Sequence, residues 1–136
     1  VLHPPENWTT DANNASLVLR VAWAGMSVLL TGDIEEAGER QLTERDCRAL
    51  ILKAPHHGSA TSSSRLLLAH VSPKAAVISG GRRRGGKVIR NEVLDRYASE
   101  GIEVFRTDYD GGVQVTVQAG LPVFESARSL RGYVHR

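Results

Sequence analysis

Apolar positions along the chain recur with two periods, one typical of strands and one typical of helices. Residues 16–23 alternate between an apolar and a mixed side, which predicts a strand, and residues 26–31 predict its partner across an Ala24-Gly25 turn. Further strands are predicted from short apolar runs at residues 49–53, 75–79, 102–107 and 113–118. The last two are expected to pair as a second hairpin around a turn at residues 108–112.

Helical patterns occupy three segments between the predicted strands. Residues 34–43 carry acids near their first turn, which suits the helix dipole, and residues 65–71 follow several hydroxyl residues able to cap a helix. Residues 92–100 are expected to form a helix that is capped by Asn91 and ended by Gly101. Helices that alternate with strands in this way predict a layered α/β domain.

The composition is that of an ordinary globular domain, with 41% hydrophobic and 24% charged residues among 136. We assign the domain to residues 1–119 and interpret residues 120–136 as a basic, weakly patterned C-terminal tail. No apolar run approaches the roughly 20 residues that cross a bilayer, and no signal peptide is visible. The single cysteine, Cys47, excludes an internal disulfide and is expected to be a partly buried thiol. Residues 1–5 look like the end of a strand already in progress, as if the chain were cut from something larger.

Two strand ends carry the candidate chemistry. The strand over residues 26–31 runs into Gly32-Asp33, and the strand over residues 49–53 runs into His56-His57. In layered α/β folds reacting groups collect at strand ends. Carboxylate and imidazole are the ligands that hold Zn²⁺ or Mn²⁺ for hydrolysis. The order and spacing of the two motifs therefore predict part of a dinuclear metallohydrolase site.

Each residue of this site also has a purely structural interpretation. Asp33 either bridges two metals or caps the following helix. His56 and His57 are expected to point apart, so that one reaches a metal or a scissile phosphate while the other packs behind it. Gly32 and Gly58 are expected to support the site, and Gly58 lets the backbone approach a ligand closely. Ser59 could donate to an anionic oxygen or orient an imidazole.

Polar and basic residues near the predicted site leave further alternatives open. Lys53 is either a phosphate contact or a solvated strand end, and Asn14 belongs either to a plain turn or to the surroundings of the metal. Arg82, Arg83 and Arg84 lie in a Gly/Arg loop, which is either solvated or a salt-dependent contact to a nucleic-acid backbone. Aromatic content is 5%, so stacking on single-stranded bases is weakly supported.

These motifs, in this order, resemble the metallo-β-lactamase-like domain of the ComEC/Rec2 competence proteins. The resemblance covers most of residues 1–119. It rests on Val-Leu-His-Pro-Pro at residues 1–5, Asn-Ala-Ser-Leu-Val-Leu at 14–19, Leu-Leu-Thr-Gly-Asp at 29–33, Pro-His-His-Gly-Ser-Ala-Thr-Ser-Ser at 55–63, Val-Ile-Ser at 77–79, Glu-Val-Leu-Asp-Arg-Tyr at 92–97 and Arg-Thr-Asp at 106–108.

The resemblance implies the C-terminal half of an αββα sandwich, with a mixed sheet and flanking helices. Members of this family are inner-membrane channel proteins that pass single-stranded DNA into the cell, and this domain is expected on the periplasmic side, where it handles or degrades the strand that does not enter. The chemistry would be two-metal phosphodiester hydrolysis. Asp33 would then be a bridging ligand, and the His56-His57 pair would lie at the metal or the phosphate, with His57 as the ligand.

Two departures from the family pattern bear on activity. The first metal motif of the family, His-x-Asp/His-x-Asp-His, belongs to the half of the fold before residue 1. A Gly-His-Pro usually precedes the Glu-Val-Leu helix, and without gaps its histidine aligns with Val88. Valine cannot bind a metal, so we expect a reduced site and little hydrolysis by this chain alone.

Two other functions remain open from the sequence. One is a freestanding metallohydrolase of small phosphoesters or lactones, and the other is a catalytically inactive DNA-contact module. The expected partners are DNA and the rest of a membrane channel protein. A sheet face left open by the missing half could also drive self-association.

Overall fold

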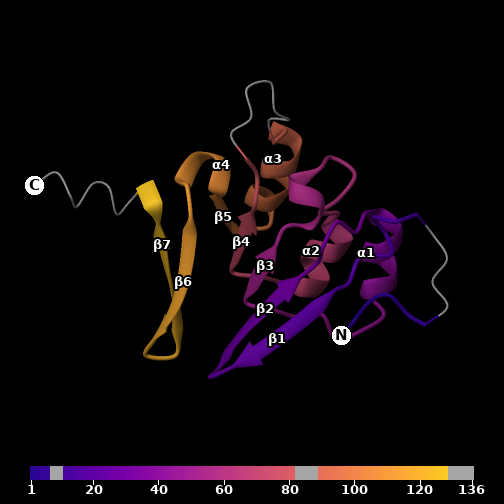
Figure 1. Cartoon of the computed structure of the whole chain (residues 1–136), viewed down its shortest axis with the longest axis horizontal. Coiled ribbons are helices and arrows are strands. Elements are labelled where there is room, and N and C mark those ends of the chain that lie inside the picture. The colour runs from indigo at the N-terminus through magenta and orange to yellow at the C-terminus, as the bar shows by residue number, and fades with distance from the viewer. Residues whose placement is uncertain (7–10, 82–88, 129–136) are drawn as a thin grey trace, which may run out of the picture.

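The computed structural model describes residues 1–6, 11–81 and 89–128. Its main element is a five-stranded sheet with the order β1-β2-β3-β4-β5, in which β1 and β2 are antiparallel and the other neighbours are parallel (Figure 1). The strands are β1 (Leu19–Trp23), β2 (Met26–Leu30), β3 (Ile51–Lys53), β4 (Ala75–Ile78) and β5 (Glu103–Arg106). This mixed sheet confirms the predicted α/β fold.

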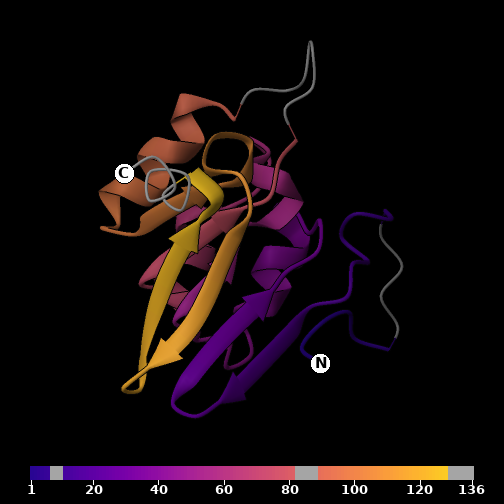
Figure 2. The ribbon, with the colours of Figure 1, turned by 60° about the vertical axis from the view of Figure 1, so that its left-hand side comes forward.

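Three helices cover one face of this sheet (Figures 1 and 2). They are α1 (Glu36–Leu42), α2 (Arg65–Val71) and α3 (Asn91–Ser99). Leu29, Leu52 and Ala76 stand beside one another across β2, β3 and β4 and are fully buried in one cluster with residues of the helices. Because successive strand residues face opposite sides, this row fixes which side of each strand meets the helices.

The ends of α3 agree only in part with the prediction. The helix begins at Asn91 itself, and the preceding Arg90 makes no side-chain capping hydrogen bond, so the expected cap is wrong. Gly101 follows the last helical turn with φ +67°, as predicted. A left-handed residue at this point suits glycine, because glycine has no Cβ to clash with the following carbonyl.

The predicted C-terminal hairpin is wrong. β5 pairs with β4 in parallel, and the one-turn helix α4 (Thr107–Asp110) follows it. A side-chain oxygen of Asp110 accepts the backbone N–H of Arg106 at 2.7 Å, which closes this turn. β6 (Val113–Gln118) pairs instead with β7 (Leu121–Ser126), inside the segment interpreted as a tail.

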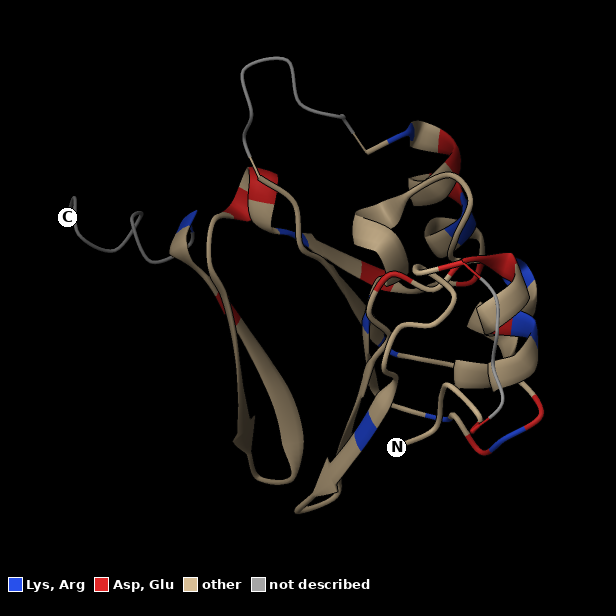
Figure 3. Cartoon of the chain, turned by 45° about the vertical axis from the view of Figure 1, so that its right-hand side comes forward, with Lys and Arg blue, Asp and Glu red and all other residues tan. Residues whose placement is uncertain are grey.

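The β6–β7 hairpin lies on the side of the main sheet opposite the helices (Figure 3). It contacts β5 through the stacked rings of Phe105 and Phe124, whose centroids are 4.4 Å apart. Toward β1 the same face is open: Val21 and Trp23, expected on an apolar face, are 44% and 48% exposed. Self-association through this face stays a prediction.

Residues 1–6, the described part of the N-terminal segment, form one isolated β-bridge to the residues before β1. The expected strand end within residues 1–5 consists of a single antiparallel bridge between His3 and Val18, with both side chains fully buried. Cys47, expected to be partly buried, is 1% exposed, so its burial is nearly complete. Within the described ranges, no helix combines the length and apolar character needed to span a membrane.

Candidate metal and phosphodiester site

The candidate site lies at the carboxyl ends of β2, β3 and β4. These strands are parallel and in register, so the segments that follow them emerge at one edge of the sheet. The first segment carries Asp33, the second carries His56 and His57, and the third begins with Ser79. The hydroxyl of Thr31 donates to the carbonyl of Lys53 at 2.7 Å and ties the first two segments together.

Gly32 brings the chain close to the loop before β1. Its φ is +56°, and a Cβ at this position would lie 2.7 Å from Cβ of Ser16. The Ser16 hydroxyl accepts the backbone N–H of Asp33 at 3.0 Å. The predicted supporting role of Gly32 is therefore structural: a side chain would push Asp33 out of this position.

Asp33 does not cap the helix that follows it, so that alternative is wrong. The N-cap position of α1 is Glu35, and the capping oxygen comes from Asn14. The side-chain oxygen of Asn14 accepts the backbone N–H groups of Glu35 and Gly38 at 2.9 and 2.8 Å. Asn14 lies in a turn, as one of the two alternatives predicted, but it is 4% exposed and its side chain caps the start of α1.

The His56-His57 segment has an unusual backbone. It forms a short 3₁₀ turn, η1 (Pro55–Gly58), in which His56 and His57 both adopt left-handed conformations, with φ +43° and +53°. Each such residue costs on the order of 1–3 kcal/mol and persists only where its surroundings enforce the conformation. The N–H of His56 donates to the carbonyl of Gly32 at 3.1 Å, and a Cβ on Gly58 would approach Ile78 to 3.0 Å.

His57 presents one ring nitrogen to Asp33. Its Nδ1 lies 2.7 Å from the carbonyl oxygen of Ser79, which can only accept, so Nδ1 carries the proton and Nε2 of the neutral ring carries a lone pair. Nε2 lies 3.5 Å from Oδ1 of Asp33, too long for a normal hydrogen bond. Two ligands of one tetrahedral zinc lie about 3.4 Å apart, given bonds of about 2.1 Å. The pair therefore fits two positions around one cation, and both side chains are partly exposed.

His56 turns to a different partner, as the prediction of diverging rings requires. Its Nδ1 lies 2.9 Å from Oε1 of Glu35, and the hydroxyl of Thr61 donates to the same oxygen at 2.8 Å. Sequence reasoning missed Glu35, because an acid at the start of a helix is explained by the helix dipole. The signal available was its position two residues after Asp33, at the same strand end.

Lys53 and Ser59 lie beside these groups with their own partners. Burial lowers the pKa of the Lys53 ammonium, and the nearby Asp33 carboxylate opposes that effect. Its Nζ donates to the carbonyl of Ala54 at 2.8 Å. The Ser59 hydroxyl is 2.9 Å from that of Thr61. Because the Thr61 proton is directed to Glu35, Ser59 donates to Thr61, and contact of Ser59 with a phosphate stays a prediction.

Two buried or half-buried side chains, Glu39 and Arg96, hold the backbone of the loop after the histidines by hydrogen bonds. The buried Glu39 carboxylate accepts the backbone N–H groups of Ser63 and Ser64. From α3, the Arg96 guanidinium donates to the carbonyls of Ala60, Ser62 and Ser63. Burial raises the pKa of the Glu39 carboxyl, and it raises the pKa of the neighbouring Tyr97 hydroxyl to about 12.

A complete set of candidate metal ligands is absent from the part of the molecule that the structure describes. Among residues 1–6, 11–81 and 89–128, no group of three or more His, Cys, Asp or Glu side chains is arranged to hold a metal ion. Metal binding by Asp33 and His57 therefore stays a prediction. Arg82, Arg83, Arg84 and Val88 lie outside the described residues.

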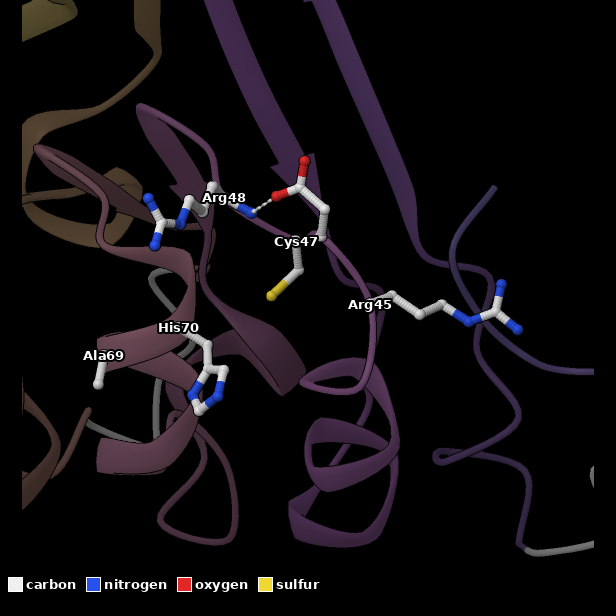
Figure 4. Close-up of a pocket in the computed structure, with 6 residues that line it drawn as sticks. Arg45, Cys47, Arg48, Ala69 and His70 are labelled. Atoms are coloured by element: carbon white, nitrogen blue, oxygen red, sulfur yellow. Dashed lines mark hydrogen bonds between the residues drawn. The ribbon is translucent and has the colours of Figure 1, made fainter.

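A cavity of about 310 Å³ lies at the other end of the sheet, before β3 (Figure 4). It is lined by Arg45, Asp46, Cys47, Arg48, Ala69 and His70. Burial raises the pKa of the Cys47 thiol, which keeps it protonated and a poor nucleophile or ligand. The strand-end site, where carboxylate and imidazole meet, remains the better candidate for chemistry.

Comparison with known proteins gives a family and several relatives. Residues 2–82 match the model of the metallo-beta-lactamase superfamily. The chain is 38% identical to Competence protein ComA of Neisseria gonorrhoeae over 88% of its length, 36% identical to ComE operon protein 3 of Bacillus subtilis over 84%, and 38% identical to Recombination protein 2 of Haemophilus influenzae over 82%. It spans only 18%, 15% and 14% of these relatives. The resemblance to ComEC/Rec2 competence proteins is confirmed.

Proposed function

Because this chain belongs to the metallo-β-lactamase superfamily, we propose that it is part of a DNA-uptake protein and contributes Asp33 and His57 to a divalent metal site that cleaves phosphodiester bonds. The observation that carries the proposal is the distance of 3.5 Å between Oδ1 of Asp33 and Nε2 of His57. The ring proton is on the other nitrogen, Nδ1, which donates to Ser79. The names of the relatives, Competence protein ComA and Recombination protein 2, support DNA as the substrate.

The donor set favours Zn²⁺ or Mn²⁺, since it pairs one carboxylate with one imidazole. When bound, such an ion supplies a hydroxide near neutral pH and neutralises charge on a phosphate. The remaining ligands are proposed to come from a part of the protein that precedes residue 1, as the family resemblance implies. Val88 stands where the family usually has the histidine of Gly-His-Pro. The proposed site therefore has one metal ligand fewer than the family pattern.

Each residue of the site is assigned a separate role in this proposal. The bond from the backbone N–H of Asp33 to Ser16 fixes the backbone at Asp33, and the carbonyl of Ser79 orients the ring of His57. We assign Lys53 to attraction of the phosphate. The nearby Asp33 carboxylate favours the charged form of its ammonium and so opposes the effect of burial on its pKa. His56 is assigned to proton transfer, because the bond from its Nδ1 to Glu35 leaves the lone pair on Nε2.

The whole protein is proposed to lie in the bacterial inner membrane, with this domain on the periplasmic side and the DNA strand that is not transported as its substrate. DNA and the membrane channel are its proposed partners. The Gly/Arg loop that contains Arg82, Arg83 and Arg84 would add salt-dependent attraction to the DNA backbone.

Calorimetric titration of Mn²⁺ and Zn²⁺ into the chelator-stripped chain tests the metal site. We expect binding that Asp33→Asn and His57→Gln each weaken at least tenfold. Asp46→Asn and His70→Gln, exposed at the far end of the sheet, serve as matched controls and should bind as the wild type does. Equal binding by Asp33→Asn and the wild type would contradict the proposed ligands. Salt-dependent DNA binding without metal binding would favour the DNA-contact module.

A further inference from the structure

The two histidines of the site differ in what holds their Nδ1 atoms. For His57 the partner is the backbone carbonyl of Ser79, at 2.7 Å. For His56 it is the side chain of Glu35, at 2.9 Å, and both of these side chains are 27% exposed. A backbone carbonyl remains whatever residue stands at position 79, whereas the partner of His56 exists only because residue 35 has an acceptor of the right length.

We infer that Glu35 is a positioning residue, which fixes His56 in the form with the proton on Nδ1 and leaves the lone pair on Nε2. An ionised carboxylate can only accept, so Nδ1 must donate to it. A neutral histidine side chain in water prefers the opposite form, with the proton on Nε2. The contact with Glu35 opposes this preference, and it does so at a residue whose backbone is left-handed.

A second bond fixes the carboxylate itself. The Thr61 hydroxyl donates to the same Oε1 that receives His56, and Ser59 donates to Thr61 at 2.9 Å. The hydroxyls of the loop after the histidines therefore act on His56 through Glu35. The loop is in turn held by Arg96, which donates to the carbonyl of Ala60 at 3.0 Å.

The tautomer matters for the site because only a deprotonated nitrogen can take up a proton or bind an ion. The use of this lone pair in proton transfer rests on the proposed function. The tautomer itself does not, since it follows from hydrogen bonds within the metal-free chain.

Two-bond proton–nitrogen NMR of the chain labelled with ¹⁵N-histidine tests the inference without metal or substrate. Spectra are recorded at rising pH until the ring signals stop changing, so that the tautomer of the neutral ring is observed. The His56 ring is identified by the signals lost in His56→Gln. In the wild type we expect a protonated Nδ1 and an unprotonated Nε2.

Three variants separate positioning from a general structural effect. Glu35→Ala should move most of His56 to the form protonated on Nε2, whereas Glu35→Gln keeps an acceptor oxygen and should retain the wild-type form. Glu36→Ala is the matched control, because Glu36 is exposed and pairs only with Arg40 on the described surface. Thr61→Val, which leaves Glu35 in place, should shift His56 in part.

A wild-type His56 protonated mainly on Nε2 would overturn the inference even if a variant failed to fold. The same tautomer in Glu35→Ala and the wild type would also overturn it. The outcome is independent of the calorimetric test: a chain that binds no metal yet shows the expected tautomers would mean that Asp33 and His57 do not bind metal without further ligands, and would leave the role of Glu35 intact.

Discussion

The side-chain oxygen of Asn14 accepts a hydrogen bond from the backbone N–H of Gly38 at 2.8 Å, across 24 residues of sequence. This bond joins the loop before β1 to the first turn of α1. The same oxygen accepts the N–H of Glu35, the residue that contacts His56. The sequence left Asn14 either in a plain turn or near a metal, and in the structure its side chain fixes where α1 begins.

Replacing Asn14 by alanine should lower the free energy of unfolding by about 1–2 kcal/mol, because two backbone N–H groups lose their acceptor in a buried place. Urea unfolding followed by circular dichroism measures the change. Asn13→Ala is the matched control, since the neighbouring residue takes part here through its backbone carbonyl. Equal losses in the two variants would contradict the capping role.

Gly32→Ala should be destabilising by about 1–3 kcal/mol, because the added Cβ would overlap with Ser16 in an already packed turn. The positive φ of Gly32 adds strain for any residue with a side chain. Thermal unfolding compares this variant with Gly112→Ala, where a Cβ meets nothing within 4 Å. A Gly32→Ala protein as stable as Gly112→Ala would show that the approach of Gly32 to Ser16 is not required.

The buried carboxyl of Glu39 should make stability fall as the pH rises. Burial raises its pKa in the folded state above the ordinary 4.5, so the folded protein holds the proton more tightly than the unfolded chain. The resulting stabilisation is complete below about pH 4.5 and is lost as the pH rises through the folded pKa. The side chain of Glu39→Gln does not titrate. The unfolding free energy of the wild type minus that of the variant should therefore decrease as the pH rises above about 4.5.

Urea unfolding of both proteins at a series of pH values measures this difference. Glu36→Gln, at an exposed position of the same helix, is the control. Parallel pH curves for the wild type and Glu39→Gln would refute the assignment.

Arg96→Lys should loosen the loop after the histidines. A guanidinium reaches the carbonyls of Ala60, Ser62 and Ser63 together, whereas one ammonium cannot span them. Hydrogen exchange should become faster at the amides of residues 62–64. Arg40→Lys, which changes an exposed ion pair with Glu36, should leave these rates unchanged. Unchanged exchange in Arg96→Lys would mean that Glu39 alone holds the loop.

Removal of the Phe124 ring should release the β6–β7 hairpin from the sheet without unfolding the rest. The stack of Phe124 on Phe105 is a contact of two large apolar side chains between otherwise separate sheets. In Phe124→Ala, exchange of the β6 and β7 amides should accelerate while β2–β4 keep their protection. Leu121→Ala, at a site 67% exposed, is the control. Cooperative loss of protection in both sheets would contradict independent docking.

The C-terminal hairpin shows where local patterns fail. Ala119-Gly120 adopts φ +50° and +76°, close to the +46° and +81° of Ala24-Gly25. The same dipeptide was sufficient to predict the first hairpin, so the cue for the second was present at residues 119–120. It was missed because the apolar run over residues 102–107 was paired with its nearest neighbour in sequence. In the structure that run pairs with β4 instead.

By itself the sequence determined that Asp33 and the His56-His57 pair stand at strand ends, because alternation and turn residues act over a few neighbouring positions. Only the tertiary structure decided what these side chains contact. The register of β2, β3 and β4 brings Asp33 within 3.5 Å of His57, and two left-handed residues turn His56 toward Glu35. Such contacts join residues some 20 positions apart. They depend on the packing of whole strands and helices, which no local pattern records.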